Sequence, residues 1–375
     1  MIFLILGLSA LLSLSGCSAF WKTKKKQEVL PGGWLNESDL DSELDSILLP
    51  SNNNYFDFRG VGDSGWARSS DSLVKPAEFG KAVENFNKER HLLDGDFNYL
   101  NWESVVAKSC DTLKKLNTLQ SFSFISHPSN ILQAFKFGFN LFGLSNNHSR
   151  DCFDSSKDGS AGEKKTTDEM HKIGRKLPLL WHGVTANGVD KNKPAVKIFK
   201  IKGKMLRVAF ASLYTGRAQC PFSACLDDAA DLFLNFKNTP ADFKILALHS
   251  QDTQGILEDW GAKFIRDFGG DIVYGTGPHI WAPVRILAKP DGKKGVMFAG
   301  LGNFIHPGLM PQKRNGMGRA LFDIKTKRLV QVQFLPLESV GSIVKYSDVS
   351  GDELEANLKW KTSSAVHGVY SNIRE

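Results

Sequence analysis

The stretch YFDFRGVGD, residues 55–63, indicates the fold class of this 375-residue chain. It is an apolar and aromatic run that ends at Gly62-Asp63, as a buried β-strand ends at a polar loop. Further runs of this kind predict strands at 97–100, 140–144, 206–213, 244–248, 271–274, 295–298, 320–324 and 329–335. Helical patterns lie between several of them, at 76–89, 129–137, 227–235 and 253–268, so we predict an α/β protein. Only residues 325–328 separate the last two strands, which predicts a hairpin and a mixed sheet.

Polar side chains follow six of these predicted strands. The loops read Gly62-Asp63, Asn101-Trp102-Glu103, Asn146-Asn147-His148 with Asp151, His249, Pro278-His279 and Gly302-Asn303. A single Asp, Asn or His at a strand end is more often a turn former or a hydrogen-bonded surface residue. Ligands of open α/β sheets, however, bind at the carboxyl ends of the strands, and six such loops together predict one shared site.

The residue types in these loops favour a metal site. Carboxylates, a side-chain amide and imidazoles suit Mn, Fe, Zn or a similar divalent ion. A carboxylate such as Glu103 can bridge two ions about 3.5–4 Å apart, a separation that suits phosphoester hydrolysis. The sequence therefore predicts one or two divalent ions and a hydrolytic reaction.

A glycine pattern at residues 60–65 offers a competing interpretation. Gly60, Gly62 and Gly65 follow a predicted strand with the spacing of a dinucleotide-binding turn. Such a turn should lead into an apolar-faced helix, which residues 66–71 do not predict, and Asp63 would repel a phosphate. We therefore favour the metal site.

The amino terminus has the pattern of an export signal. Residues 2–14 form an apolar run that is too short to cross a hydrocarbon core of about 30 Å, although no Lys or Arg precedes it. The sequence Leu14-Ser15-Gly16-Cys17-Ser18 resembles a bacterial lipobox, so we predict a signal peptide at 1–16 and lipidation at Cys17. A buried amino-terminal helix is the alternative. The first interpretation places the protein in the bacterial cell envelope, attached to the membrane by its lipid anchor.

The charge is concentrated behind this cysteine. The chain has a net charge of +7, and four of these charges are Lys22, Lys24, Lys25 and Lys26; subtracting them leaves +3. That remainder is too small to predict a nucleic-acid partner. The lysines either lie on anionic headgroups or are simply solvated, and residues 17–54 are predicted to form a basic tether and an acidic linker.

Four cysteines remain after Cys17, an even number that suits disulfides in an exported protein. Three pairings are possible. The close spacing of Cys220 and Cys225 suits a small loop bridge, which would leave Cys110 with Cys152. A four-cysteine zinc site is the alternative, but there is no second close pair.

The order of these motifs resembles the bacterial capsule-synthesis protein CapA family, also described as the poly-γ-glutamate synthesis family, over residues 56–307. The family's Gly-Asp with a later Arg corresponds to Gly62-Asp63 and Arg68, and its Asn-Leu-Glu to Asn101-Trp102-Glu103. Its Asn-Asn-His-x-x-Asp is intact at 146–151, and its Leu-Gly-Asn-Phe at 301–304. The resemblance implies a calcineurin-like metallophosphoesterase sandwich of mixed β-sheets flanked by helices. We expect this domain at 55–340, with a carboxyl-terminal extension at 341–375.

The resemblance also implies roles for individual residues. The metal ligands would be Asp63, Glu103, Asn147, His249 and His279. His148 would protonate the leaving oxygen and Asp151 would orient it, while Arg68 and Asn303 would contact an anionic polymer or phosphoester substrate. Membrane proteins of capsule assembly are the expected partners.

Two departures from the family bear on activity. Only the His of the family's His-Trp-Gly-x-Glu remains, at His249, and Gly277 replaces the first His of its Gly-x-His-Pro-His. Two functions therefore stay open. One is a metal-dependent hydrolase, and the other is a non-catalytic accessory or scaffold protein of capsule or poly-γ-glutamate assembly.

Overall fold

The computed structural model describes residues 53–65, 79–80, 82–84, 92–114, 123–155, 160–216, 220–251, 254–305, 312–340, 343–347, 351–359, 364–366 and 369–372. The predicted signal peptide, Cys17, nearly all of the tether and Arg68 lie outside these residues. None of the helices within these ranges is long and apolar enough to cross a bilayer.

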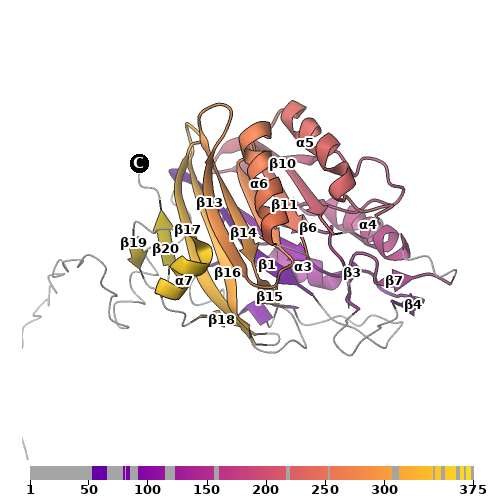
Figure 1. The fold of residues 1–375 in the computed structure, drawn as a ribbon. Coiled ribbons are helices and arrows are strands. Elements are labelled where there is room, and N and C mark those ends of the chain that lie inside the picture. The colour runs from indigo at the N-terminus through magenta and orange to yellow at the C-terminus, as the bar shows by residue number, and fades with distance from the viewer. Residues whose placement is uncertain are drawn as a thin grey trace, which may run out of the picture. The chain divides into compact units, whose positions relative to one another are not determined.

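Two β-sheets form the body of the protein (Figure 1). The 10-stranded sheet runs β19 (Ser364–Val366), β20 (Val369–Asn372), β17 (Leu329–Val340), β16 (Gln312–Asp323), β1 (Tyr55–Ser64), β2 (Phe97–Trp102), β6 (Leu141–Gly143) and β8 (Leu180–His182), with β15 (Asn303–Ile305) beside β1 and β18 (Ile343–Tyr346) beside β17. The 6-stranded sheet runs β13 (Trp281–Ala288), β14 (Lys294–Leu301), β12 (Ile272–Thr276), β11 (Phe243–His249), β10 (Lys204–Tyr214) and β9 (Ala195–Ile201). Two short pairs, β3 (Val105–Val106) with β5 (Ile125–Ser126) and β4 (Thr112–Leu113) with β7 (Cys152–Phe153), lie in the loops.

The centre of each sheet is parallel and its margins are antiparallel. Strands β1, β2, β6 and β8 are parallel neighbours, and so are β10, β11, β12 and β14. Strands β16, β17, β9 and β13 add antiparallel pairs. Parallel strands bring their carboxyl ends to one edge of a sheet, so this arrangement gathers the loops that carry the predicted site residues.

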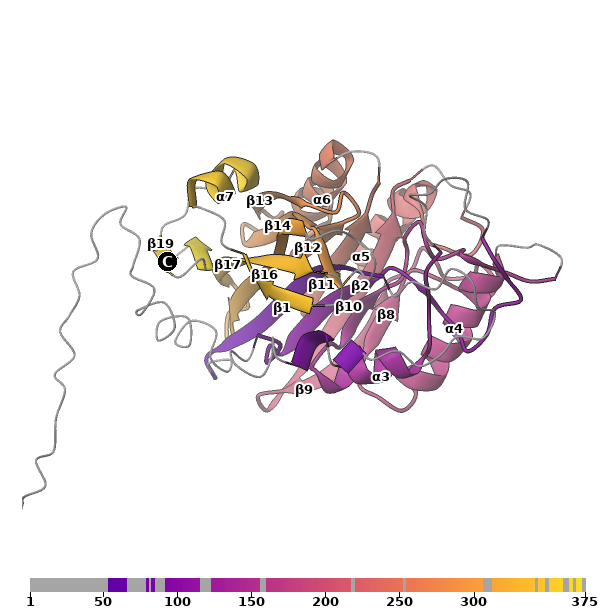
Figure 2. The same cartoon turned by 90° about the horizontal axis from the view of Figure 1, so that it is seen from below.

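The core lies between the sheets and continues under the helices. Aromatic side chains of the facing strands meet inside, for example Phe58 and Phe243, whose ring centroids are 4.7 Å apart. Helices α3 (Ser129–Lys136) and α4 (Ser160–Gly174) pack on the outer face of the larger sheet, and α5 (Ala229–Asn238) and α6 (Gln254–Phe268) on that of the smaller one (Figure 2). The result is a sandwich of two mixed sheets flanked by helices, which confirms the predicted fold class.

The predicted elements correspond closely to the observed ones. Every strand predicted from an apolar run coincides with an observed strand, and the hairpin across 325–328 joins β16 to β17. The helices predicted at 129–137, 227–235 and 253–268 correspond to α3, α5 and α6, and the described residues of 76–89 are helical at 79–80 and 82–84. The segment 341–375 contributes β18 and β20, which pair with β17, and α7 (Gly351–Leu358).

The cysteines form two disulfides, Cys110–Cys152 and Cys220–Cys225. This confirms the pairing that the close spacing of Cys220 and Cys225 favoured and excludes the four-cysteine zinc site. Cys152 directly follows Asp151, so the first disulfide fixes the chain next to a predicted catalytic residue.

Gly60 and Gly62 are packing positions inside a strand rather than residues of a dinucleotide-binding turn. Gly60 and Gly62 both lie within β1, and a Cβ atom at Gly62 would stand 1.9 Å from the carbonyl oxygen of Gly302. The next amide, that of Asp63, donates a hydrogen bond of 2.8 Å to the same carbonyl. Glycine is therefore required here because β1 and the turn before β15 approach closely.

Replacing Gly62 with alanine is expected to lower the free energy of unfolding by about 1–3 kcal/mol, because the added methyl group must push these two segments apart. Chemical denaturation measures the effect. Gly255→Ala is the matched control, since no atom beyond its chain neighbours and its own helix backbone lies within 4 Å of a Cβ at that position and alanine favours helix. Equal stability of the two variants would contradict the close approach.

Candidate metal centre

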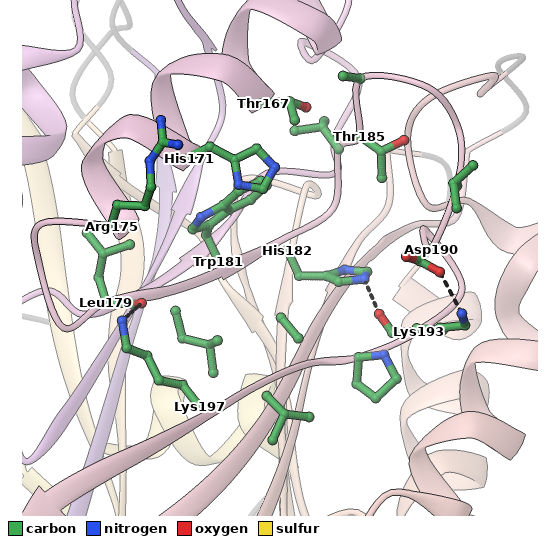
Figure 3. Close-up of a pocket in the computed structure, with 18 of the residues that line it drawn as sticks. Thr167, His171, Arg175, Leu179, Trp181, His182, Thr185, Asp190, Lys193 and Lys197 are labelled. Atoms are coloured by element: carbon green, nitrogen blue, oxygen red, sulfur yellow. Dashed lines mark hydrogen bonds and ion pairs between the residues drawn. The ribbon is translucent and has the colours of Figure 1, made fainter.

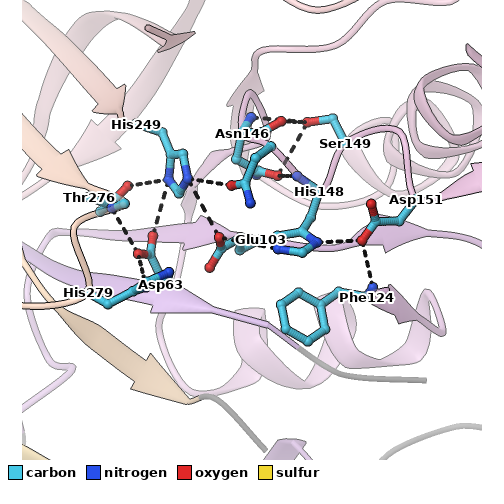
Figure 4. Close-up of polar contacts among 12 residues, drawn as sticks. Asp63, Glu103, Phe124, Asn146, His148, Ser149, Asp151, His249, Thr276 and His279 are labelled. Atoms are coloured by element: carbon cyan, nitrogen blue, oxygen red, sulfur yellow. Dashed lines mark hydrogen bonds and ion pairs between the residues drawn. The ribbon is translucent and has the colours of Figure 1, made fainter. Parts of the chain in front are cut away.

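The carboxyl ends of strands from both sheets converge on one buried polar cluster (Figure 4). In the larger sheet, Asp63 of β1 pairs with Asn101 of β2. In the smaller sheet, His249 of β11 pairs with Thr276 of β12. The cluster therefore forms where two sheets, distant in sequence, present their strand ends to each other.

Asp63 is the centre of this cluster. Its side chain is fully buried, with Oδ1 2.6 Å from Asn101 Nδ2 and 3.4 Å from His249 Nδ1. Oδ2 accepts a hydrogen bond of 2.9 Å from the Gly277 amide and lies 3.2 Å from His279 Nδ1. Burial alone would raise the pKa of Asp63, but His249 and His279 outweigh burial and hold that pKa well below its usual value. Asp63 is therefore an anion.

Glu103 and His279 complete a group of possible metal ligands with Asp63. One ligand atom of each lies within 4.8 Å of the others. Glu103 is fully buried, whereas the side chain of His279 is 33% exposed and has a left-handed backbone conformation, φ 59°. Burial lowers the pKa of His279, yet its hydrogen bond to Asp63 and the charge of Glu103 raise that pKa to about 10. Two buried carboxylates thus create a site that attracts cations.

The donor set fits a divalent ion. Two carboxylates and an imidazole match the preferences of Mn, Fe and Zn. In addition, the buried Oδ1 of Asn101 has no hydrogen-bond donor among the described residues, and a bound ion or an ordered water would satisfy a buried oxygen of this kind. The residues present therefore suit the predicted cofactor.

The other two predicted ligands, His249 and Asn147, contact each other beside this group. His249 Nε2 lies 2.7 Å from Asn147 Oδ1 and 3.6 Å from Glu103 Oε1. The Nδ1 atom of the same ring lies 2.9 Å from Thr276 Oγ1. The structure thus brings all five predicted ligands together, and Asp63, Glu103 and His279 each offer one ligand atom within 4.8 Å of the others.

His148 and Asp151 form a dyad next to Glu103. Asp151 is buried, and its Oδ2 atom contacts His148 Nδ1 and accepts a hydrogen bond of 2.8 Å from the Phe124 amide. His148 Nε2 faces Glu103 Oε1 at 3.9 Å. Burial lowers the pKa of His148, but Asp151 and Glu103 raise it by more, so that pKa lies above its usual value. The imidazole is oriented through Nδ1, and its other nitrogen faces the centre.

Asn303 is buried at the edge of the cluster. Its Oδ1 atom lies 2.8 Å from His279 Nδ1, and its backbone amide donates a hydrogen bond of 2.6 Å to Asn315 Oδ1. Its predicted role in substrate contact stays a prediction, as does that of Arg68, which the structure does not describe.

Gly277, where the resemblance implies an imidazole, leaves no room for a side chain. Its φ is 105°, a conformation that residues with a side chain rarely adopt, and a Cβ there would stand 2.2 Å from the Ser250 carbonyl oxygen. The backbone amide that contacts Asp63 belongs to this same residue. The observed geometry therefore requires glycine at position 277.

Thr276 and Phe124 contact the cluster but were not predicted from the sequence, and Asn101 was predicted to lie at the shared site without a role of its own. Asn101 and Thr276 lie at the ends of predicted strands, so the strand-end rule was a sufficient signal for both. Phe124 contributes only its backbone amide and a ring 4.2 Å from that of His148, and the sequence carries no signal for either contact.

Comparison with known proteins identifies the family. The family model described as "Bacterial capsule synthesis protein PGA_cap" matches residues 59–307, more than half of the chain. A solved crystal structure of a hypothetical protein from Thermus thermophilus shows 12% sequence identity and a TM-score of 0.43, and the match covers 75% of this chain and 99% of that one. No curated protein matches. The motifs at Asp63, Glu103 and His148 fall within the range of the family model. The chain therefore belongs to the bacterial capsule synthesis protein PGA_cap family.

Proposed function

We propose that this protein is a metal-dependent hydrolase of the cell surface, acting on an anionic polymer or a phosphoester in capsule or poly-γ-glutamate synthesis. The observation that carries the proposal is the group formed by Asp63, Glu103 and His279, which lies beside the His148–Asp151 dyad. Hydrolysis of an ester requires a group that binds a metal ion and, next to it, an imidazole held in position to transfer a proton.

Asp63, Glu103 and His279 would hold one divalent ion, with His249 and Asn147 available for the same ion or a second one. The metal could be Mn, Fe, Zn or a similar ion. Such an ion supplies Lewis acidity, which polarises a substrate oxygen and makes a nearby water more acidic.

The His148–Asp151 dyad would supply the proton to the leaving oxygen. Asp151 holds the imidazole of His148 through Nδ1, and the Phe124 amide fixes the carboxylate in turn. Asp151 raises the pKa of His148 and so favours the protonated ring, and Nε2 is the atom that would pass the proton to the leaving oxygen. Burial of Glu103, Asp63 and Asp151 keeps bulk water away from these charges.

The direct test is hydrolysis of bis(p-nitrophenyl) phosphate, and of poly-γ-glutamate as a polymer substrate, by protein that has been stripped with a chelator and then reloaded. We expect turnover of at least one substrate only after a divalent ion is restored, and no turnover by Glu103→Gln. Turnover that persists without metal, or in Glu103→Gln, would overturn the proposal.

A second candidate function is a non-catalytic accessory or scaffold protein of the same assembly. It is favoured by Gly277, whose backbone excludes the family's imidazole. This candidate predicts that the metal-loaded protein hydrolyses neither substrate, and that Asp63→Asn has no effect on capsule formation in cells. Loss of capsule in that variant would instead support the hydrolase.

The cellular location is part of the proposal. We propose export to the bacterial envelope and acylation of Cys17, with the basic residues behind it close to the membrane and membrane proteins of capsule assembly as partners. Mass spectrometry of the mature amino terminus should find an acylated Cys17. An uncleaved Met1 would contradict this.

A further inference from the structure

A cavity of about 730 Å³ lies apart from the metal centre, and none of the residues of that centre lines it. Its walls are α4, β8, the loop from Val184 to Pro194 and the first residues of β9 (Figure 3). These are the edge strands of the two sheets, so the cavity is at the open side of the sandwich. Its volume falls within the range of about 300–1,000 Å³ that is typical of small-ligand sites.

One face of α4 supplies polar groups to this cavity. Thr167, His171 and Arg175 are spaced by four residues, and Arg175 continues the helix by donating its amide to the His171 carbonyl at 3.2 Å. Residues at this spacing share a face of a helix. The ring of His171 meets that of Trp181 edge to face, with centroids 5.0 Å apart. Trp181 is half-buried and lines the cavity beside His171, and its ring is here called the floor of the cavity.

Lys197 reaches the cavity from β9, opposite this face. Its ammonium group donates to the carbonyl oxygens of Leu177 at 3.2 Å and Leu179 at 3.1 Å. An ammonium has three N–H groups, so one remains that no described residue accepts. The two carbonyls hold this cation in place beside the floor of the cavity.

The cations in and around this cavity differ in whether a carboxylate of the described residues neutralises them. Lys172 forms an ion pair with Glu169, Lys191 with Asp228, and Lys193, also at the cavity, with Asp190. By contrast, neither Arg175 nor Lys197 forms an ion pair with a carboxylate of the described residues. The cavity therefore has an excess of positive charge that the described part of the chain does not neutralise.

His182 lies under the same cavity but serves the fold. It is buried, Nδ1 accepts a hydrogen bond of 3.0 Å from the Ser212 amide, and Nε2 lies 2.9 Å from the Lys193 carbonyl oxygen. Burial lowers the pKa of His182 to about 4, so the ring is neutral at physiological pH. It fixes β8 to β10 and to the loop at Lys193, and this contact keeps the cavity wall in position.

We propose that this cavity binds an acidic saccharide, with a sugar ring on Trp181 and the sugar carboxylate between Arg175 and Lys197. An aromatic floor suits the apolar face of a sugar ring, and a guanidinium binds a carboxylate in a bidentate manner. Asn187 also lines the cavity, and its side-chain NH₂ group is suited to a sugar hydroxyl, whereas the hydroxyls of Thr167 and Thr185 are bonded to backbone carbonyls of the chain. A linear polyanion such as poly-γ-glutamate has no ring to place on Trp181. The site goes beyond the proposed hydrolysis and does not depend on it, because binding here requires no metal ligand.

Isothermal titration calorimetry of the full chain with an oligomer of galacturonic acid tests the proposal. We expect binding, with Arg175→Gln and Lys197→Met each weakening it by about tenfold or more, because each removes a charged hydrogen bond. Trp181→Leu should weaken binding similarly, whereas Trp181→Phe should retain most of it because a ring remains. Thermal unfolding of each variant shows whether the fold is intact.

Lys172→Gln is the matched control. It removes the same charge from the same helix, but Lys172 does not line the cavity, so affinity should be unchanged. An equal loss of affinity in Lys172→Gln and Arg175→Gln would indicate nonspecific attraction and overturn the proposal. Binding of a neutral galactose oligomer or of poly-γ-glutamate with equal affinity would overturn it too, as would no binding of the uronic acid oligomer. Since these are binding measurements, they are independent of whether the metal centre hydrolyses anything.

Discussion

Asp57→Asn is expected to lower the free energy of unfolding by about 3–5 kcal/mol, because it leaves two buried cations without their anion. Asp57 is fully buried in β1 and contacts two guanidinium groups. Its Oδ2 atom lies 2.7 Å from Nη2 of Arg59, two residues along the same strand, and 2.7 Å from Nη2 of Arg319 on β16. Chemical denaturation of the variant and the wild type measures the difference.

The same group gives stability a pH dependence of known sign. Burial raises the pKa of Asp57, but Arg319 and Arg59 outweigh burial and hold that pKa well below its usual value. Its contribution is therefore complete above an unfolded pKa of about 3.9 and is lost as the pH falls towards the folded value. Wild-type protein should lose more stability on acidification than Asp57→Asn. Asp291→Asn, at an ion pair with about half-exposed side chains, is the control and should change stability by less than about 0.5 kcal/mol. A comparable effect of the two substitutions would contradict this view of the cluster.

His148→Gln is expected to lower turnover by about 10²- to 10⁴-fold, the usual contribution of a general acid. The bound metal should remain, because His148 is not among the three grouped ligands. Steady-state kinetics on a metal-loaded sample, together with its metal content, separates these two effects. Asp151→Asn should cause a smaller loss, since it removes the group that orients the imidazole but leaves the imidazole itself.

His127→Gln is the control for this substitution. His127 contacts Ser129 at 2.8 Å at the start of α3 and no residue of the metal centre, so turnover should be unchanged. Retained turnover in His148→Gln would remove this residue from the mechanism. Loss of metal together with turnover would show instead that the imidazole supports the ion.

The central strands could be predicted because they are buried on both faces and therefore read as continuous apolar runs. The elements that the sequence did not predict have weaker patterns. Strand β9, AVKIFKI, has two lysines, β13 contains Pro283, and β8 is only three residues long. Helix α4 is rich in polar residues and contains Gly162, whose Cβ would approach the Ser149 carbonyl oxygen at 2.8 Å. Tertiary contacts, rather than local propensity, determine these elements.

The sequence predicted those residues of the site that lie at the carboxyl ends of strands. The strand-end rule identified Asp63, Glu103, His148, His249 and His279 because each lies at or shortly after the carboxyl end of a strand of the parallel region. It could not show that Asn303 contacts His279, or that Gly277 contributes an amide to Asp63 from a conformation that excludes a side chain. It also missed the cluster of Asp57, Arg59 and Arg319, because two of these lie inside one strand and the third is 262 positions from Asp57. Such contacts depend on register between strands, which a single sequence does not reveal.

The metal content of the purified protein tests the central claim most directly. Elemental analysis of the full chain, prepared with excess divalent metal and then freed of unbound ions, should find one or more ions per chain. Asp63→Asn and Glu103→Gln should lose that metal while remaining folded, as measured by circular dichroism. A content near zero in the wild type, or an unchanged content in both variants, would contradict a metal centre formed by these residues.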